Sequence, residues 1–215
     1  MYRVRTLFVV NPVSNNGRTL RNWQKIVIAL NARGYDIEYI LTSGPLDATD
    51  ITRKALQESY EMVVAVGGDG TINEVANGFY YHDELINPAA SLSAIPMGTG
   101  GDLTRVFPFP RTVDGIVRLL VKPEIQVCDL GKAIYINWDG EECSRYFINT
   151  ADIGLGADVC IRVNRNSKAM GGFISFLKAA IGAIAAFKNY TLSVIVDGKN
   201  IYKGESSLVA VGNGK

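Results

Sequence analysis

Short apolar runs and helical patterns alternate through the first 121 residues of the chain. Four runs are bounded by turn residues and typical of buried strands: residues 5–10, 36–41, 62–66 and 92–95. The segments that follow them carry apolar residues at helical spacing: one that ends near residue 32, then residues 48–59, 72–79 and 111–121. This alternation predicts a doubly wound α/β domain built on a parallel sheet. The second helix is expected to be capped by Asp47 or Thr49.

The pattern changes after Pro123. Residues 124–138 read as a strand, Asp139 and Gly140 as a hairpin turn, and residues 143–153 as the strand that pairs back. Residues 190–196 and 200–211 repeat this arrangement, and residues 207–211 are expected to be buried. The second half is therefore antiparallel, and we expect an α/β domain over residues 1–124 and an incomplete antiparallel β-sandwich domain over residues 125–215.

A long apolar segment, residues 169–187, separates the two predicted hairpins. Its length approaches the ~20 residues of a membrane span. Lys178 and several small residues argue against a span, as does its position between two hairpins. Two interpretations stay open: a helix packed on the β domain, and a surface that contacts a membrane or a lipid tail.

Composition narrows the class of protein. The chain has 215 residues, of which 47% are hydrophobic and 20% charged, and its formal net charge is +1. This composition is typical of a globular protein, and the small net charge gives no overall electrostatic attraction to nucleic acid. His82 is the only histidine, which excludes a histidine-based triad or a multi-histidine zinc site within this chain. Three cysteines without a C-x-x-C pair are expected to be buried thiols, and the absence of a leader pattern predicts a cytoplasmic location.

The run at residues 62–66 ends in the sequence Gly67-Gly68-Asp69-Gly70-Thr71, which opens a helical pattern. A strand, a glycine turn and a helix together aim backbone N–H groups and a helix N-terminus at an anion. The closing Gly-Lys-Ser/Thr of a P-loop is missing, and the last glycine of the dinucleotide fingerprint is replaced by Asn73. Asp69 is unusual beside a phosphate, so a metal ion, a sugar hydroxyl or a proton to be removed must account for it.

Two further turns are expected near this one. The first predicted strand ends in Asn11-Pro12-Val13-Ser14-Asn15-Asn16-Gly17, and the fourth ends in Pro96-Met97-Gly98-Thr99-Gly100-Gly101-Asp102. Thr42 follows the second predicted strand. In an open α/β sheet, ligands bind at the carboxyl ends of the strands, so these segments are expected to line one crevice.

Together these motifs resemble the catalytic domain of the diacylglycerol kinase family, which includes bacterial lipid kinases and sphingosine kinases. The resemblance rests on residues 67–78, on the Asn-Pro-x-Ser start and on a P-x-G-T-x-N-D-like turn in which Gly101 replaces the asparagine. It extends to residues 147–156 and covers essentially the whole chain. The loop around Asp69 is also similar to that of NAD kinases and phosphofructokinases, which implies the same kind of α/β domain.

The resemblance implies ATP as cofactor, together with Mg²⁺, and a lipid hydroxyl of diacylglycerol or a sphingoid-like lipid as acceptor. Asp69 is the implied catalytic residue, acting either through Mg²⁺ or by polarising the acceptor hydroxyl; the metal ligands stay open. The implied nucleotide-binding residues are Asn11, Pro12, Ser14, Asn15, Thr42, Gly67, Gly68, Asp69, Gly70, Thr71, Asn73, Glu74, Gly98, Thr99 and Asp102. A lipid acceptor further implies that the protein acts at a membrane surface, as a peripheral protein without a transmembrane segment. The oligomeric state is left open, with a homodimer as one option.

Two other functions stay open. One is an NAD kinase-like phosphotransferase, and the other is a nucleotide-binding remnant without catalysis. The chain ends at the turn Gly212-Asn213-Gly214-Lys215, whereas lipid kinases of this type continue further, so we expect a fragment whose own activity is in question.

Overall fold

The computed structural model describes residues 4–98, 103–166, 181–182, 184 and 187–213. Contacts between Cα atoms divide the chain into two compact units, residues 1–149 with 213–215, and residues 150–212. The predicted boundary after residue 124 marks a different feature, the change from parallel to antiparallel strands, and it stays a prediction.

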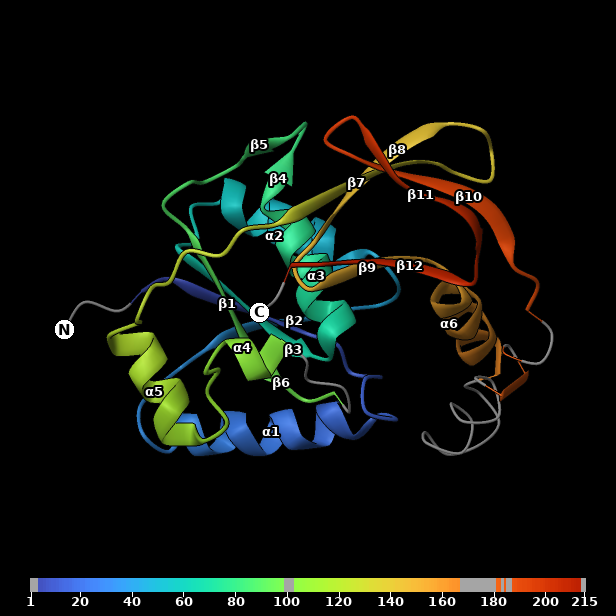
Figure 1. Cartoon of the computed structure of the whole chain (residues 1–215). Coiled ribbons are helices and arrows are strands. Elements are labelled where there is room, and N and C mark those ends of the chain that lie inside the picture. The colour runs from blue at the N-terminus through green and yellow to red at the C-terminus, as the bar shows by residue number, and fades with distance from the viewer. Residues whose placement is uncertain (1–3, 99–102, 167–180, 183, 185–186, 214–215) are drawn as a thin grey trace. The chain divides into compact units, whose positions relative to one another are not determined.

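A parallel sheet forms the centre of the first unit (Figure 1). Its strands are β1 (Thr6–Val10), β2 (Glu38–Leu41), β3 (Met62–Gly67) and β6 (Ser91–Pro96), in the order β2-β1-β3-β6. All three pairings are parallel, which confirms the predicted α/β fold. All six residues of β3 are buried because the strand has neighbours on both sides and helices over both faces.

The two faces of the sheet carry different helices (Figure 1). Helices α1 (Arg18–Asn31) and α5 (Val113–Val121) cover one face, and α2 (Asp47–Gln57) and α3 (Asp69–Gly78) cover the other. Successive strand side chains point to opposite faces. Phe8 and Val64 therefore pack in the cluster that contains Trp23 of α1, whereas Val9 and Val63 pack with α2 and α3. The apolar runs of these strands fill both cores.

The start of α2 corrects one expectation. Its N-cap is Leu46 in a left-handed conformation with φ of 68°, and no side chain caps the helix. Asp47 instead accepts hydrogen bonds from the backbone N and the hydroxyl of Ser43, at 2.6 and 2.8 Å. The Thr49 hydroxyl donates to the carbonyl oxygen of Glu74 at 2.9 Å. Both predicted caps are wrong because each side chain has a partner outside the first turn.

Two antiparallel hairpins complete the first unit. The first hairpin consists of β4 (Tyr80–Tyr81) and β5 (Glu84–Leu85). The predicted strand over 124–138 is confined to β7 (Gly131–Ile136), which pairs with β8 (Glu142–Phe147) across the predicted turn. A short helix, α4 (Leu103–Val106), precedes α5. The cysteines Cys128 and Cys143 are free and half-buried, less buried than expected.

The second unit contains β9 (Thr150–Gly154), α6 (Leu155–Asn166), β10 (Tyr190–Val196), β11 (Lys199–Ser206) and β12 (Leu208–Gly212). The β10–β11 hairpin is as expected. Residues 150–153 do not extend the first hairpin, since β9 pairs with β12. The expected burial of residues 207–211 is also wrong, because Val211 is 57% exposed.

The predicted apolar segment at residues 169–187 lies mostly outside the described residues, so its two interpretations stay open. Within the part of the chain that the structure describes, every helix is too short or too polar to cross a bilayer.

The described strands of the second unit form small antiparallel sheets, which confirms the kind of structure expected for the second half of the chain.

Candidate nucleotide site at the carboxyl edge of the sheet

The loops that follow β1, β3 and β6 meet at the carboxyl edge of the parallel sheet. The Asn11 N–H donates to the Val66 carbonyl at 2.9 Å, and the Met97 N–H donates to the Gly67 carbonyl at 2.7 Å. Thr42 joins the same edge, since its N–H donates to the Val10 carbonyl at 2.9 Å. The chain leaves β1 for β2 on one side and β3 for β6 on the other, so the strand order reverses here. In α/β sheets this position forms the ligand crevice.

Helix α3 begins inside this crevice. Gly68 is its N-cap, in extended conformation, and no side chain caps the helix start. Asp69, Gly70 and Thr71 form the first turn, whose N–H groups have no carbonyl partner within a helix. A Cβ atom added to Gly70 would meet nothing within 4 Å. The start of α3 thus brings the partial positive charge of a helix N-terminus to this edge of the sheet, an arrangement that suits an anion.

Two glycines are needed here because the backbone comes close to other atoms. A Cβ atom on Gly67 would lie 2.5 Å from the Thr71 hydroxyl oxygen. A Cβ atom on Gly98 would lie 2.7 Å from the Cα atom of Gly68. The turn after β6 therefore lies directly against the turn after β3, as the two glycine-rich motifs predicted.

The loop after β1 is held by its own polar side chains. The Asn11 amide donates to the Thr71 hydroxyl at 3.1 Å, which links this loop to the first turn of α3. The Ser14 hydroxyl donates to the Asn11 carbonyl at 3.0 Å and lies 2.6 Å from the Thr19 hydroxyl. Asn15 adopts a positive φ of 53°. Asn11, Ser14 and Asn15, with Pro12 between them, are partly buried, and their contact with a nucleotide stays a prediction.

Asn77 is a polar residue of α3 that belongs to the stretch carrying the family resemblance but was not among the predicted site residues. Its amide donates to the carbonyls of Asn73 and Tyr146, both at 2.8 Å, and its oxygen accepts the Tyr146 N–H at 2.9 Å. Asn73, a predicted nucleotide residue, accepts the Ile148 N–H at 3.2 Å. The spacing of four residues puts both amides on one helix face, and together they hold the main chain of β8 and the residue after Phe147. This spacing was the signal available in the sequence.

Tyr146 has further polar partners. Its hydroxyl donates to Asp83 at 2.8 Å, and Lys132 forms an ion pair with the same carboxylate at 2.7 Å. Burial, and then the bond to Asp83, raises the pKa of Tyr146 to about 12. The bond from Lys132, and then the bond from Tyr146, lowers the pKa of Asp83. Tyr146 also stacks on Tyr80 with ring centroids 4.2 Å apart, so the two hairpins of the first unit are joined by polar and aromatic contacts.

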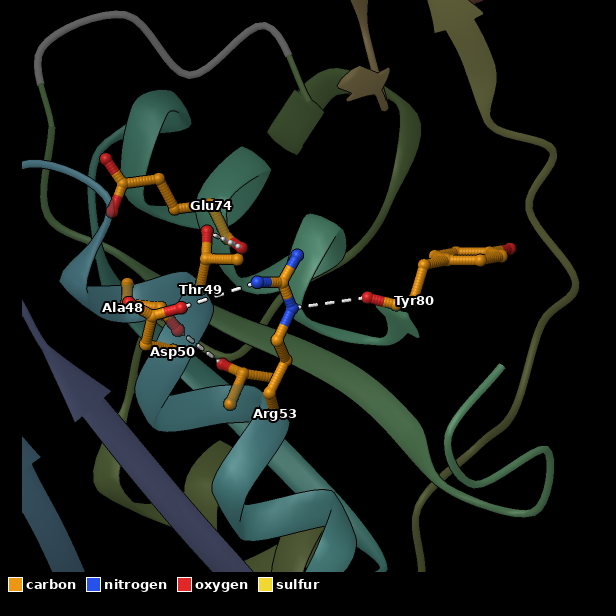
Figure 2. A network of polar contacts seen from close by, with 7 residues as sticks. Ala48, Thr49, Asp50, Arg53, Glu74 and Tyr80 are labelled. Atoms are coloured by element: carbon orange, nitrogen blue, oxygen red, sulfur yellow. Dashed lines mark hydrogen bonds and ion pairs between the residues drawn. The ribbon is translucent and has the colours of Figure 1, made fainter. Parts of the chain in front are cut away.

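Glu74, another predicted nucleotide residue, takes part in a network through its main chain. Figure 2 shows Thr49 of α2 donating to the Glu74 carbonyl, and Arg53 donating to the Tyr80 carbonyl at 3.3 Å. Arg53 also pairs with Asp50 at 3.4 Å. These contacts fix α2 against α3 and the first residue of β4. The structure thus gives Glu74 a packing contact and leaves its carboxylate half-buried.

The remaining predicted residues divide into two groups. Asp69 is half-buried at the start of α3, and Gly98 is exposed after β6. Thr99 and Asp102 lie outside the described residues. Among the residues that the structure does describe, no group of three or more histidine, cysteine or acidic side chains could hold a metal ion. A single carboxylate is nevertheless enough for Mg²⁺ that is shared with nucleotide phosphates, because this ion keeps several water ligands.

The fold is a parallel α/β domain in which the loops after β1, β3 and β6 meet at the start of α3. Comparison with known proteins gives the family. The model of the diacylglycerol kinase catalytic domain matches residues 5–133, and the chain belongs to this family.

Similar proteins include the diacylglycerol kinase of Staphylococcus carnosus strain TM300, 29% identical over 98% of this chain and 64% of the relative. The diacylglycerol kinase of Staphylococcus aureus strain MRSA252 is 30% identical over 98% of this chain and 62% of its own length. A crystal structure of a diacylglycerol kinase from Bacillus anthracis strain Sterne matches with a TM-score of 0.64 and 25% identity, covering 100% of this chain and 66% of that one. The chain thus spans less than two thirds of the length of the curated relatives it matches.

Proposed function

We propose that this chain carries the nucleotide site of an ATP-dependent kinase that phosphorylates a lipid hydroxyl, of diacylglycerol or of a sphingoid-like lipid. Membership of the diacylglycerol kinase family supports the reaction class. The observation that carries the proposal is the uncapped start of α3, enclosed by the loops after β1 and β6. A lipid acceptor would bring the protein to a membrane surface.

The polyphosphate of ATP would lie on the N–H groups that follow Gly67. Phosphoryl transfer depends mainly on positioning and on neutralisation of charge. The N–H groups supply both, since their positions are fixed by the contact of Gly67 with Thr71 and by the bond from Asn11 to Thr71. The other proposed nucleotide contacts line the same edge: Pro12, Ser14, Asn15, Thr42, Gly68, Gly70, Asn73, Glu74, Gly98, Thr99 and Asp102.

Asp69 is the proposed catalytic residue. Its carboxylate would share Mg²⁺ with the phosphate oxygens or polarise the acceptor hydroxyl. When bound, Mg²⁺ neutralises phosphate charge. In its absence, Asp69 would repel the nucleotide, because both groups are anionic. Removing the carboxylate charge should therefore weaken ATP binding when Mg²⁺ is present and should not weaken it when Mg²⁺ is absent.

The experiment measures ATP binding by calorimetry with and without Mg²⁺, for the wild-type chain and for Asp69→Asn. With Mg²⁺ we expect the variant to bind about tenfold more weakly, which corresponds to ~1.4 kcal/mol. Without Mg²⁺ the variant should bind as tightly as the wild type or more tightly. Asp50→Asn is the matched control, since Asp50 is an exposed carboxylate on α2. If the wild-type chain binds ATP neither with nor without Mg²⁺, the proposal is wrong.

A phosphorylation screen then separates the candidate acceptors. Diacylglycerol, sphingosine and NAD are each offered with ATP and Mg²⁺. Phosphorylation of either lipid supports the proposal, and phosphorylation of NAD alone favours the NAD kinase-like alternative. ATP binding with no acceptor phosphorylated favours a nucleotide-binding protein without catalysis.

A further inference from the structure

The first unit contains an apolar pocket that the nucleotide site does not use. Its volume is about 190 Å³. The floor is formed by Ala76 of α3, by Phe79 directly after this helix and by Ile148, which are at most 9% exposed. The pocket reaches the surface at Leu85 of β5, which is 42% exposed. The wall is completed by Tyr80, Ala90, Leu92, Phe107, Phe109, Cys128 and Leu130.

The lining excludes most ligand classes. None of the lining residues is charged, and the polar side chains among them are limited to a tyrosine and a cysteine. The Cys128 thiol already donates to the Asp129 carbonyl at 3.2 Å. A water molecule needs two to four polar partners to be stable in a cavity, and a polar ligand has the same requirement. The chemistry of the pocket therefore favours a hydrocarbon.

The size of the pocket fixes how much hydrocarbon it can take. An apolar cavity of about 150 Å³ accommodates benzene, which has six carbons. At the same density, 190 Å³ holds about eight carbons of a single chain. The lining offers no cation to pair with a fatty-acid carboxylate, and Glu84 and Asp129, which adjoin lining residues in the sequence, are exposed acids.

We propose that this pocket binds one hydrocarbon chain of an uncharged lipid, such as a glyceride. The existence of the pocket is independent of the proposed kinase function, and only the choice of a neutral lipid rests on that function. Ala76 of the pocket floor lies on α3 seven residues after Asp69, and Phe79 follows the end of this helix, so the bound chain and the proposed phosphate site would lie at opposite ends of α3.

Cys128 gives a direct readout, because a chain in the pocket would cover its thiol. In a Cys143→Ser, Cys160→Ser background, Cys128 is the one remaining thiol, and its rate of reaction with a maleimide is measured against monoacylglycerol concentration without ATP. A Cys128→Ser, Cys160→Ser chain retains Cys143, which is half-buried outside the pocket, and serves as the control. Circular dichroism checks that both chains are folded.

Monoacylglycerols of four to twelve carbons should protect Cys128, and protection should strengthen about fourfold per added carbon because each buried methylene contributes a near-constant free energy. The increase should level off near eight carbons. Ala90→Leu fills the pocket and should abolish protection, whereas Ala89→Leu, an exposed neighbour outside the lining, should not. Equal protection of Cys143, no dependence on chain length, or equal protection by decanoate would each overturn the proposal. Loss of ATP binding would leave this result unchanged, so the two proposals fail separately.

Discussion

The bonds from Asn77 to β8 lead to a quantitative prediction about the stability of the first unit. Asn77 is 8% exposed and makes three hydrogen bonds of 2.8, 2.8 and 2.9 Å. In Asn77→Asp the shape is kept, but the amide donor becomes a carboxylate oxygen that faces the carbonyls of Asn73 and Tyr146. Two donated bonds are lost and the new carboxylate faces two carbonyl oxygens, and each such loss at a buried polar group costs about 1–3 kcal/mol.

Since Tyr146 is only half-buried, water can reach part of this region, and we take the lower half of the range. The expected loss is about 3 kcal/mol, a large share of the 5–15 kcal/mol typical of a domain. With a slope of about 2 kcal/mol per molar urea, the midpoint of unfolding should fall by about 1.5 M. Fluorescence of Trp23, which is fully buried, follows the transition in a Trp138→Phe background, because Trp138 is 98% exposed and would obscure it.

Asn22→Asp is the matched control, since Asn22 is an exposed residue of α1 and the chemical change is the same. Its midpoint should change by no more than the equivalent of about 0.5 kcal/mol. Hydrogen exchange at the Tyr146 amide adds a local measurement, and its protection should drop in Asn77→Asp. An unchanged urea midpoint and unchanged Tyr146 exchange would show that the amide of Asn77 does not hold β8.

Three further predictions concern single groups. The pKa of Tyr146 in the folded protein, about 12, should lie above that of an ordinary tyrosine when the titration is followed by absorbance at 295 nm. The stability that the protonated hydroxyl contributes should be complete below pH ~10 and lost as the pH rises toward 12. Asp83→Asn should lower the pKa of Tyr146, and an unchanged pKa would exclude Asp83 as a cause of the shift. Gly67→Ala should reduce the free energy of unfolding by about 1–3 kcal/mol, because the new methyl group meets the Thr71 side chain at 2.5 Å; an unchanged urea midpoint would contradict this contact. Gly70→Ala should leave stability unchanged or raised by up to ~1 kcal/mol, because its methyl group meets nothing within 4 Å, yet weaken ATP binding; tight ATP binding in that variant would place the phosphates elsewhere.

The strands and glycine turns of the first unit could be predicted because they depend on apolar and glycine residues that are close together in the sequence. The run from Met62 to Val66 is apolar on both faces of the sheet, which only a central parallel strand requires. Glycines at 67, 68 and 70 mark the turn, and the contact of Gly67 with Thr71 gives one reason for them. The neighbouring positions of the three edge loops follow from parallel strand order, since all carboxyl ends then lie at one edge.

The errors concern contacts between distant parts of the chain. β9 pairs with β12, more than 50 residues later, so the apolar pattern of residues 143–153 could not reveal that the hairpin ends at Phe147. The alternation of residues 207–211 indicates a strand but does not show what covers it, and Leu208 is 46% exposed. Asp47 has the side chain of a helix cap, but Ser43 supplies a nearer donor.

For Asn73, the role that the motif predicts differs from the hydrogen bond that its side chain makes in the structure. The motif groups it with Asp69 and Gly70, yet its side-chain oxygen accepts the Ile148 N–H, one turn below the start of the helix. Asn77 repeats the interaction one turn further along. Helix α3 therefore begins at the carboxyl edge of the sheet and, over its next two turns, hydrogen-bonds β8 and the residue after it along one side. Since the helix spans only ten residues, or about 15 Å, these two regions form one rigid body. The asparagines of the motif thus fix the helix that positions the glycines, so one short stretch of sequence supplies both these polar contacts and the proposed phosphate site.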